Sequence, residues 1–225
     1  MALGGKGMLV VFTDVKSRDE RDLNEWYNRE HIDERVGMPG FRRARRYVSV
    51  RGAPRYLATY ECESVTDLAT PAYLAVLANQ TPWSQAVMAR FTHFTRLTLR
   101  IQLDLTHGAG GAVTTVRFVP NTARKHALLK WLRDTALPRA IKQPGMLGAA
   151  AGENDLDVAN APILQKSMDR PRAEDIAWLV ILEGADARAT AAAARRAFTR
   201  AALKQFGVTQ APVIGSYRFL FGNQR

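Results

Sequence analysis

The chain has 225 residues, of which 47% are hydrophobic and 24% charged, as in an ordinary globular protein. Its one cysteine, Cys62, excludes an internal disulfide framework, and no apolar run approaches the ~20 residues of a membrane span. The net charge of +11 favours anionic partners, although arginines that only solvate the surface give the same excess. Because the first residues do not read as a signal peptide, we expect a cytoplasmic protein without a membrane partner.

The first half of the chain is predicted to alternate strand, helix, strand, strand, helix and strand. Ser17 and Glu20 form a capping box that starts the first helix, and Pro39-Gly40 lies where that helix must end. Alternating apolar residues and turn residues give the strands. In chain order the elements are Met8–Val15, a helix from Ser17 to about Arg35, strands at Arg43–Val50 and Arg55–Cys62, a helix at Thr70–Asn79, and a strand at Arg96–Leu105.

Several residues recur 105 positions further along the chain. Trp131 repeats Trp26, and Pro144-Gly145 repeats Pro39-Gly40. A constant offset in the same order indicates an internal duplication, and the repetition of Trp26 assigns it to the core. We therefore predict two halves, 1–107 and 108–225. The second half is predicted to have elements at Ala112–Pro120, Thr122–Ile141, Leu147–Gly152, Ala177–Glu183, Ala187–Phe206 and Ile214–Phe221.

The second half is longer than the first. Matching Glu63 to Glu183 gives an offset of 120, which implies about 15 extra residues. They fall in a polar segment at about 152–173 that contains Pro162 and Pro171, and we expect an irregular excursion there. Such a long connection covers a cavity, contacts a second chain or is disordered.

A repeated βαββαβ pattern is the ferredoxin-like unit, an α+β fold with helices on one face of an antiparallel sheet. In the closing strand Leu97, Leu99 and Ile101 alternate with polar residues, so one face is apolar. We expect that apolar face to lie under the helices. The polar face predicts that two sheets face each other around a partly wet cavity, inside one chain.

Two stretches carry a family resemblance: "WYNREHIDERVGMPGFRRARRY" after the first strand, and "TPWSQAVMARFTHF" later in the first half. They resemble the EthD-like branch of the dimeric α/β-barrel superfamily over most of residues 8–103, and over 112–221 the resemblance is weak. The resemblance implies a barrel of two facing ferredoxin-like sheets. The superfamily includes cofactor-independent monooxygenases, lactone isomerases, polyketide cyclases, dehalogenases and haem enzymes.

His31 is the main candidate for a catalytic residue, because imidazole exchanges a proton near neutral pH. Tyr27 lies one helical turn before it, and Glu30 is placed to orient it or to pair with an arginine. The alternative is a structural histidine at a helix C-terminus. At the 105 offset Glu30 and His31 become Thr135 and Ala136, so the fold position does not require a histidine. We therefore expect one site per chain, and expect His31→Ala to fold with only a surface-like change in stability.

Arg46 and Arg100 are predicted to bind an anionic or enolate-like oxygen of a substrate, if they face the cavity. On a strand, Arg43 and Arg45 face away from Arg42 and Arg46, so "RRARR" makes no single basic stripe. The sequence has no nucleic-acid reader motif, and we expect no nucleic-acid partner.

No metal and no cofactor are expected, because the histidines show no ligand spacing and Cys62 stands alone. A single axial histidine for haem, such as His93 or His126, stays open. The favoured interpretation is a cofactor-independent enzyme that acts on a small aromatic or lactone-like oxygenated metabolite by proton transfer in a barrel pocket. The rivals are a non-catalytic ligand-binding or assembly protein and a haem-binding barrel. Homo-oligomerisation also stays open.

Overall fold

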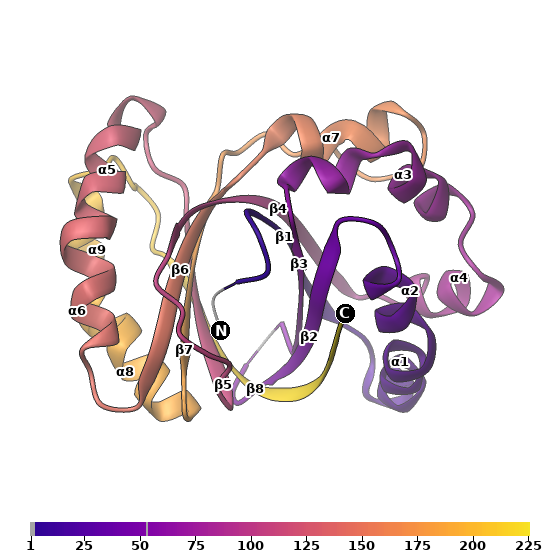
Figure 1. Ribbon diagram of the computed structural model, residues 1–225, viewed down its shortest axis with the longest axis horizontal. Coiled ribbons are helices and arrows are strands. Elements are labelled where there is room, and N and C mark those ends of the chain that lie inside the picture. Colours follow the sequence, from indigo (N-terminus) through magenta and orange to yellow (C-terminus); the bar gives the residue numbers. More distant parts are fainter. Residues whose placement is uncertain (1–2, 53) are drawn as a thin grey trace.

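Eight antiparallel strands close into a barrel in the order β1-β3-β2-β8-β5-β7-β6-β4 (Figure 1). The structure is a computed structural model that describes residues 3–52 and 54–225. The strands are β1 (Gly7–Asp14), β2 (Phe41–Ser49), β3 (Tyr56–Cys62) and β4 (His93–Asp104) in the first half, and β5 (Ala112–Phe118), β6 (Met146–Asn154), β7 (Trp178–Gly184) and β8 (Val213–Gln224) in the second.

Helices cover the barrel on two opposite sides, one layer outside each half of the sheet (Figure 1). The first-half helices are α1 (Glu20–Trp26), α2 (Ile32–Val36), α3 (Pro71–Ala78) and α4 (Pro82–Met88), and the second-half helices are α5 (Lys125–Trp131), α6 (Leu137–Ile141), α7 (Leu156–Leu164), α8 (Ala187–Ala197) and α9 (Arg200–Lys204). Within the described residues, no helix is long and apolar enough to cross a membrane.

Each half has the same strand order, β4-β1-β3-β2 and β8-β5-β7-β6, which is that of the ferredoxin-like unit. Two seams join the halves: β2 pairs with β8, and β4 pairs with β6. The predicted α+β class and the antiparallel barrel are confirmed.

The elements from β1 to β2 correspond, at an offset of 105 residues, to the elements from β5 to β6. Even a π-helical turn at Tyr27–His31 recurs at Leu132–Ala136, between α5 and α6 as the first lies between α1 and α2. The next corresponding strands, β3 and β7, are 122 residues apart, so the second half carries 17 extra residues between β6 and β7. Glu61, rather than Glu63, therefore corresponds to Glu183, because both lie one residue before the strand's last residue.

Apolar side chains fill the middle of the barrel. Leu97, Leu99 and Ile101 point into it together with Met8 and Val10 of β1. The expectation that this face of β4 lies under the helices was wrong, because alternation does not specify which face of a sheet meets the helices. After a register shift at Ile101, the strand turns its apolar side toward the second-half helices.

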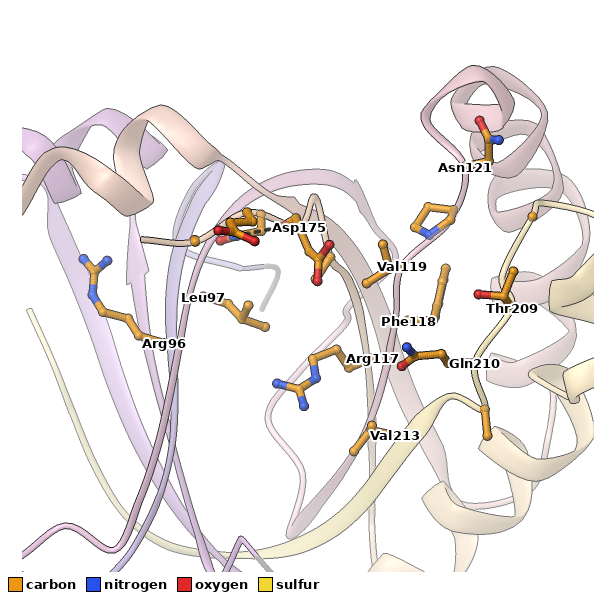
Figure 2. A pocket seen from close by; sticks show the side chains of 17 residues that line it. Arg96, Leu97, Arg117, Phe118, Val119, Asn121, Asp175, Thr209, Gln210 and Val213 are labelled. Atoms are coloured by element: carbon orange, nitrogen blue, oxygen red, sulfur yellow. Dashed lines mark hydrogen bonds between the residues drawn. The ribbon is translucent and has the colours of Figure 1, made fainter. Parts of the chain in front are cut away.

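The expected wet cavity between the sheets is confined to one end of the barrel. A cavity of about 650 Å³ opens there, and Figure 2 shows Arg117 pointing into it from β5. Asp175 and Gln210 line the same space from two connecting segments, so its walls are largely polar.

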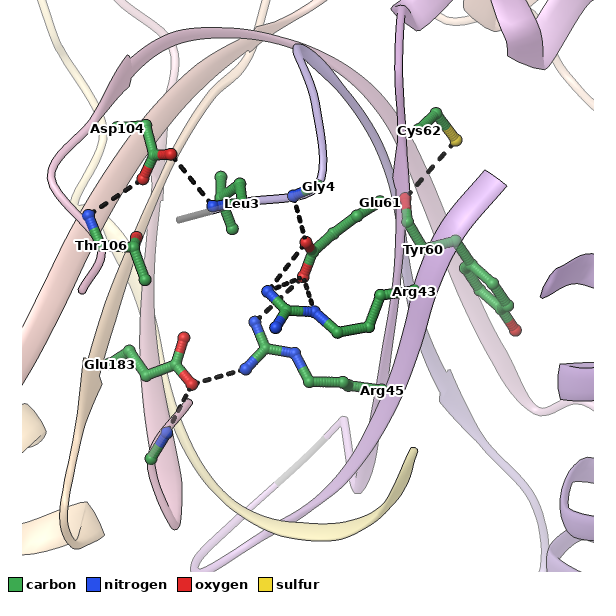
Figure 3. A network of polar contacts seen from close by, with 11 residues as sticks. Leu3, Gly4, Arg43, Arg45, Tyr60, Glu61, Cys62, Asp104, Thr106 and Glu183 are labelled. Atoms are coloured by element: carbon green, nitrogen blue, oxygen red, sulfur yellow. Dashed lines mark hydrogen bonds and ion pairs between the residues drawn. The ribbon is translucent and has the colours of Figure 1, made fainter. Parts of the chain in front are cut away.

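A buried ionic cluster crosses the inside of the barrel (Figure 3). Arg43 binds Glu61 through two hydrogen bonds of 2.9 Å. Arg45 reaches both glutamates, with Nη2 3.2 Å from Glu61 and Nη1 2.5 Å from Glu183. Backbone N–H groups of Gly4 and Gly110 donate to the two carboxylates. Arg45 therefore connects the halves by a charge-assisted contact in the low-dielectric interior.

The segment expected to be irregular begins as helix α7, so that expectation was wrong for its first part. Asp155 caps the helix by accepting from the N–H of Val158, and Pro162 lies inside the last turn, where its missing N–H removes one intrahelical hydrogen bond. Val158 packs into the core of the first half rather than the second. Residues 165–177 then run without regular structure back to β7, as predicted. We call 165–173 the strap.

Helix α4 had no counterpart in the predicted elements, and the long helix expected at Ala187–Phe206 is two helices, α8 and α9. Thr81 and Thr199 start α4 and α9 by capping them, each hydroxyl accepting an N–H three residues on. These two capping threonines were the sequence signals that the prediction missed.

Candidate functional site

His31 lines a cavity of about 230 Å³ between the first-half sheet and its helices. The cavity therefore lies on the outer face of the barrel wall, not between the two sheets as predicted. Apolar walls come from residues such as Leu9, Leu77 and Phe91, and the strap covers one side with Met168 and Arg170. Because a cavity of ~150 Å³ holds benzene, this one has room for one ring with substituents or two fused rings.

The π-helical turn at Tyr27–His31 sets the arrangement of aromatic rings around His31. The imidazole stacks on Trp26 with ring centroids 4.2 Å apart and a 28° interplanar angle. Tyr27 and Tyr60 approach it edge-on, at 5.3 and 5.9 Å. Single π turns inside helices are frequent at functional sites. Trp26, assigned to the core from the sequence, both packs in the core and lines the cavity.

His31 is only 9% exposed, and burial lowers the pKa of its imidazole well below 6.5, with the cations of Arg35 and Arg46 adding to the effect. The ring is therefore neutral at pH 7. Its Nδ1 lies 3.9 Å from Oε2 of Glu34, too far for a hydrogen bond, and a neutral ring makes no ion pair there. Nδ1 has no hydrogen-bond partner within the described part of the chain.

Two phenols complete the wall beside His31. Tyr60 points outward from β3 while its neighbour Glu61 points into the barrel (Figure 3). Burial raises the pKa of Tyr60 well above 10 and raises that of Tyr27 as well, so both keep their O–H protons at neutral pH. The buried Tyr60 hydroxyl interacts with the Tyr27 hydroxyl, but it makes no hydrogen bond of good geometry among the described residues, and a poorly paired buried hydroxyl is costly unless a ligand or water meets it.

Two buried arginines hold positive charge close to these rings. Arg46 is 1% exposed, lies 3.8 Å above the Tyr27 ring, and donates to the amide oxygen of Asn24 at 3.0 Å. Arg35 lies 3.1 Å from Glu34. Burial lowers the pKa of Arg46 from its usual value, yet the group stays charged at neutral pH. The site thus combines a neutral base, phenolic donors and cations, which suits developing negative charge on an oxygen.

The structure brings His31, Tyr27 and Arg46 together but separates the other predicted site residues from them. Glu30 accepts hydrogen bonds from the Trp26 indole N–H, from Thr81 at 2.6 Å and from Ser84 at 3.0 Å, and so ties α4 to α1. Arg100 is half exposed and pairs with Asp155 beside the β4–β6 seam. Sequence reasoning missed Glu34, Arg35 and Tyr60; the four-residue spacing from His31 to Arg35 was the signal available.

The histidines considered for haem do not fit that group. His93 is exposed, lies 3.1 Å from Thr95, and lines a cavity of about 170 Å³, below the ~300–1,000 Å³ of common cofactor sites. His126 is exposed on α5. Among the described residues, no cluster of three His, Cys, Asp or Glu side chains could hold a metal ion.

The second half shows the same fold positions without the site. Leu132, Ala136 and Ala140 occupy the positions of Tyr27, His31 and Arg35. All three are buried in the apolar core between the second-half sheet and its helices. Ala151 and Leu182, which correspond to Arg46 and Tyr60, lie in the same core. The fold therefore does not need polar side chains at these five positions.

Comparison with known proteins supports the fold. The chain matches no protein-family model and none of the curated proteins. Among solved structures it is similar to an anthrone oxidase-like protein, with a TM-score of 0.66, 13% identity, and coverage of 100% of this chain and 95% of that one. It is also similar to a provisionally named monooxygenase from Lactobacillus acidophilus NCFM, with a TM-score of 0.60, 10% identity, and coverage of 97% and 95%.

A third similar structure is a provisionally named chlorite dismutase, with a TM-score of 0.56, 14% identity, and coverage of 96% of this chain and 94% of that one. At these identities the likeness shows the fold alone, that of the dimeric α/β-barrel proteins. At least 96% of this chain and at least 94% of each neighbour are covered, so the likeness extends to both halves.

Proposed function

We propose that this chain is a cofactor-independent enzyme that moves a proton on a small aromatic, oxygenated substrate bound in the His31 cavity. The observation that carries the proposal is the contrast between the halves. The first half buries an imidazole, two phenols and two arginines around a cavity, and the second half packs apolar side chains at the same positions. Burial of such groups is unfavourable, and active sites are where such cost is commonly found.

In this mechanism His31 is the general base. Nδ1 lies 3.9 Å from Glu34, whose carboxylate favours the proton on Nδ1 and leaves Nε2 to take the substrate proton. An acidic C–H or phenolic O–H bond of the substrate breaks, an N–H bond forms on His31, and the electron pair stays on the substrate as an enolate or phenolate. The Tyr60 O–H stabilises the oxygen that gains this charge, and the Arg46 cation, which lies against the Tyr27 ring rather than in the cavity wall, adds a positive field.

The names of the similar structures, monooxygenase and anthrone oxidase-like, favour dioxygen as the second substrate. A deprotonated ring carbon is electron-rich enough to reduce dioxygen without a cofactor. For a ring CH₂ group, the carbon becomes a carbonyl: one oxygen atom enters the product, and the other leaves as water with the two hydrogens. The apolar walls of the cavity suit such a substrate.

We also propose that the chain belongs to the EthD-like branch and arose by duplication of one ferredoxin-like unit, with units at 1–107 and 108–225. The 105-residue offset of the elements, the repeated strand order and the repeated π turn support this origin. After duplication only the first unit kept the polar site. One site per chain is then expected.

Turnover and binding measured on matched variants test the function. 2-Tetralone, 1-naphthol and hydroxynaphthoic acids, all with two fused rings, are incubated with the wild-type chain, and oxygen uptake and deuterium exchange at acidic C–H positions are followed. His31→Ala and His31→Gln should lower the rate by at least ~100-fold, the lower range of general-base contributions. His126→Ala, an exposed histidine on α5, is the control and should leave the rate unchanged. Binding without chemistry would favour a ligand-binding protein, and full activity of His31→Ala would refute the mechanism.

A further inference from the structure

Four arginines surround the His31 cavity, and their charges are poorly compensated. Arg35, Arg96 and Arg170 line it, and Arg46 lies next to it against the Tyr27 ring. Within residues 3–52 and 54–225, only Arg35 among them has a carboxylate within 4.0 Å, that of Glu34. The cavity and its mouth therefore carry an excess of positive charge, as the whole chain does.

Among the three of these arginines that are not exposed, Arg96 is the least satisfied by direct contacts. It projects from the helix-facing side of β4 and is half-buried. Its two hydrogen bonds, to the Ala159 carbonyl and to the Tyr73 hydroxyl, are both 3.4 Å long, near the limit for such a bond. A guanidinium has five N–H donors in a planar fork, so most of its donors remain available to a ligand.

Arg96 also lies where the cavities meet. It lines the His31 cavity, an adjoining cavity of about 280 Å³ beneath the strap, and the 650 Å³ cavity at the barrel end. Figure 2 shows its guanidinium directed away from the barrel end, toward the first-half helices. A ligand with its ring beside His31 therefore meets Arg96 on the way out of the cavity.

The strap adds a second cation at the same place. Arg170 lies over the ring of Phe94, with 4.4 Å from its guanidinium carbon to the ring centroid. Phe94, Arg96 and Arg170 all line both the His31 cavity and the 280 Å³ cavity. Asp169 is the acidic side chain of this mouth; it is exposed, and no arginine of the described residues pairs with it.

We infer that the ligand of the His31 cavity is an aromatic carboxylate whose acid group is bound by Arg96, with Arg170 closing over it from the strap. Arg forms paired hydrogen bonds to a carboxylate, and pairing relieves the cost of a partly desolvated cation. The inference rests on the proposed function for the position of the ring beside His31, but it concerns binding, which is measurable without turnover.

The test compares 2-naphthoate with its neutral methyl ester, two probes of nearly the same shape. Calorimetric titration of the full chain should give at least ~10-fold tighter binding of the acid, as expected for hydrogen bonds to charged groups. Arg96→Gln should remove most of that preference and leave ester binding within about twofold, because only the charge-assisted contact is lost. Arg100→Gln, on the same strand but paired with Asp155, is the matched control and should keep the preference.

The outcomes separate this inference from the proposed function. Equal binding of acid and ester, or equal loss of both in Arg96→Gln, overturns the carboxylate assignment. If Arg96→Gln folds poorly, the salt dependence of the wild-type chain decides: the acid-to-ester ratio should fall as salt rises, since partly exposed charge pairs are screened. A ratio independent of salt also overturns the inference. His31→Ala should abolish turnover and keep the acid preference, so loss of activity alone does not affect this assignment.

Discussion

Replacing His31 with alanine should change the pH dependence of stability more than stability at neutral pH. A surface-like change of about 0.5 kcal/mol was expected from the sequence, but the ring is buried and stacked on Trp26. Loss of the stacked contact costs about 0.5–1.5 kcal/mol, while removal of an unpartnered buried nitrogen returns part of it. At pH 7.5 we therefore expect a loss of about 1 kcal/mol.

The pH dependence follows from the lowered pKa of His31. In the unfolded chain a histidine titrates near pH 6.5, whereas in the folded chain this one stays neutral to lower pH. Below pH 6.5 the unfolded state binds more protons, so the stability of the wild-type chain falls as pH falls. At pH 5.5 this linkage removes about 1.4 kcal/mol, one pKa unit of differential proton binding. His31→Ala lacks that loss, so the two proteins should become about equally stable near pH 5.5.

Urea unfolding followed by far-ultraviolet circular dichroism at pH 7.5, 6.5 and 5.5 measures the effect. His126→Ala, at an exposed position on α5, should follow the wild-type pH dependence closely. A difference between wild-type and His31→Ala free energies that stays constant within about 0.5 kcal/mol over this range would contradict a neutral buried imidazole. The reasoning about its availability as a base would then fail as well.

Three further predictions follow from buried side chains. Tyr60→Phe should change the free energy of unfolding by no more than about 1 kcal/mol, because the buried hydroxyl makes only a weak contact with the Tyr27 hydroxyl, while turnover falls; a larger loss of stability would show a strong hydrogen bond at Tyr60. Arg45→Met should cost about 3–5 kcal/mol in chemical denaturation by leaving Glu183 without its cation, and Arg45→Met with Glu183→Gln should recover most of it; no recovery would mean that packing, not charge, is lost. Ala136→His should lower the thermal midpoint sharply, because an imidazole does not fit the packed second-half core, and a stable variant would refute the contrast between the halves.

The element order was predictable from the sequence because it depends on local signals that repeat. Pro39-Gly40 and the paired tryptophans mark the same elements in both halves. The capping box predicted at Ser17 and Glu20 was wrong, because neither side chain caps the helix and Glu20 instead accepts a hydrogen bond from Tyr56. The strand faces were not predictable, since Leu97 and Leu99 satisfy period-two alternation equally well facing the helices or the barrel. Only the closure of eight strands decides that these leucines point inward.

The candidate site was partly predictable for a related reason. His31 and Tyr27 are close in sequence, and the second half supplied the comparison that singled them out. Tyr60 and Arg96 come from strands far away in the chain, and nothing local distinguishes them from other strand residues. Glu30 was misplaced as an orienting group because adjacent residues of a helix point in different directions, and Glu30 is turned toward Ser84.

The β2–β8 seam has a consequence for how the chain folds. Arg43 of β2 pairs with Gln224 of β8, so during synthesis the outer edge of β2 stays open until the last strand emerges. Contacts between such distant residues form slowly, and an open strand edge is a template for aggregation. The arginines of β2, which looked like a nucleic-acid motif, place charge on this unpaired edge. Charged side chains on an edge strand oppose its pairing with other chains. Loss of β8 should therefore cause aggregation before it causes any loss of the first-half core.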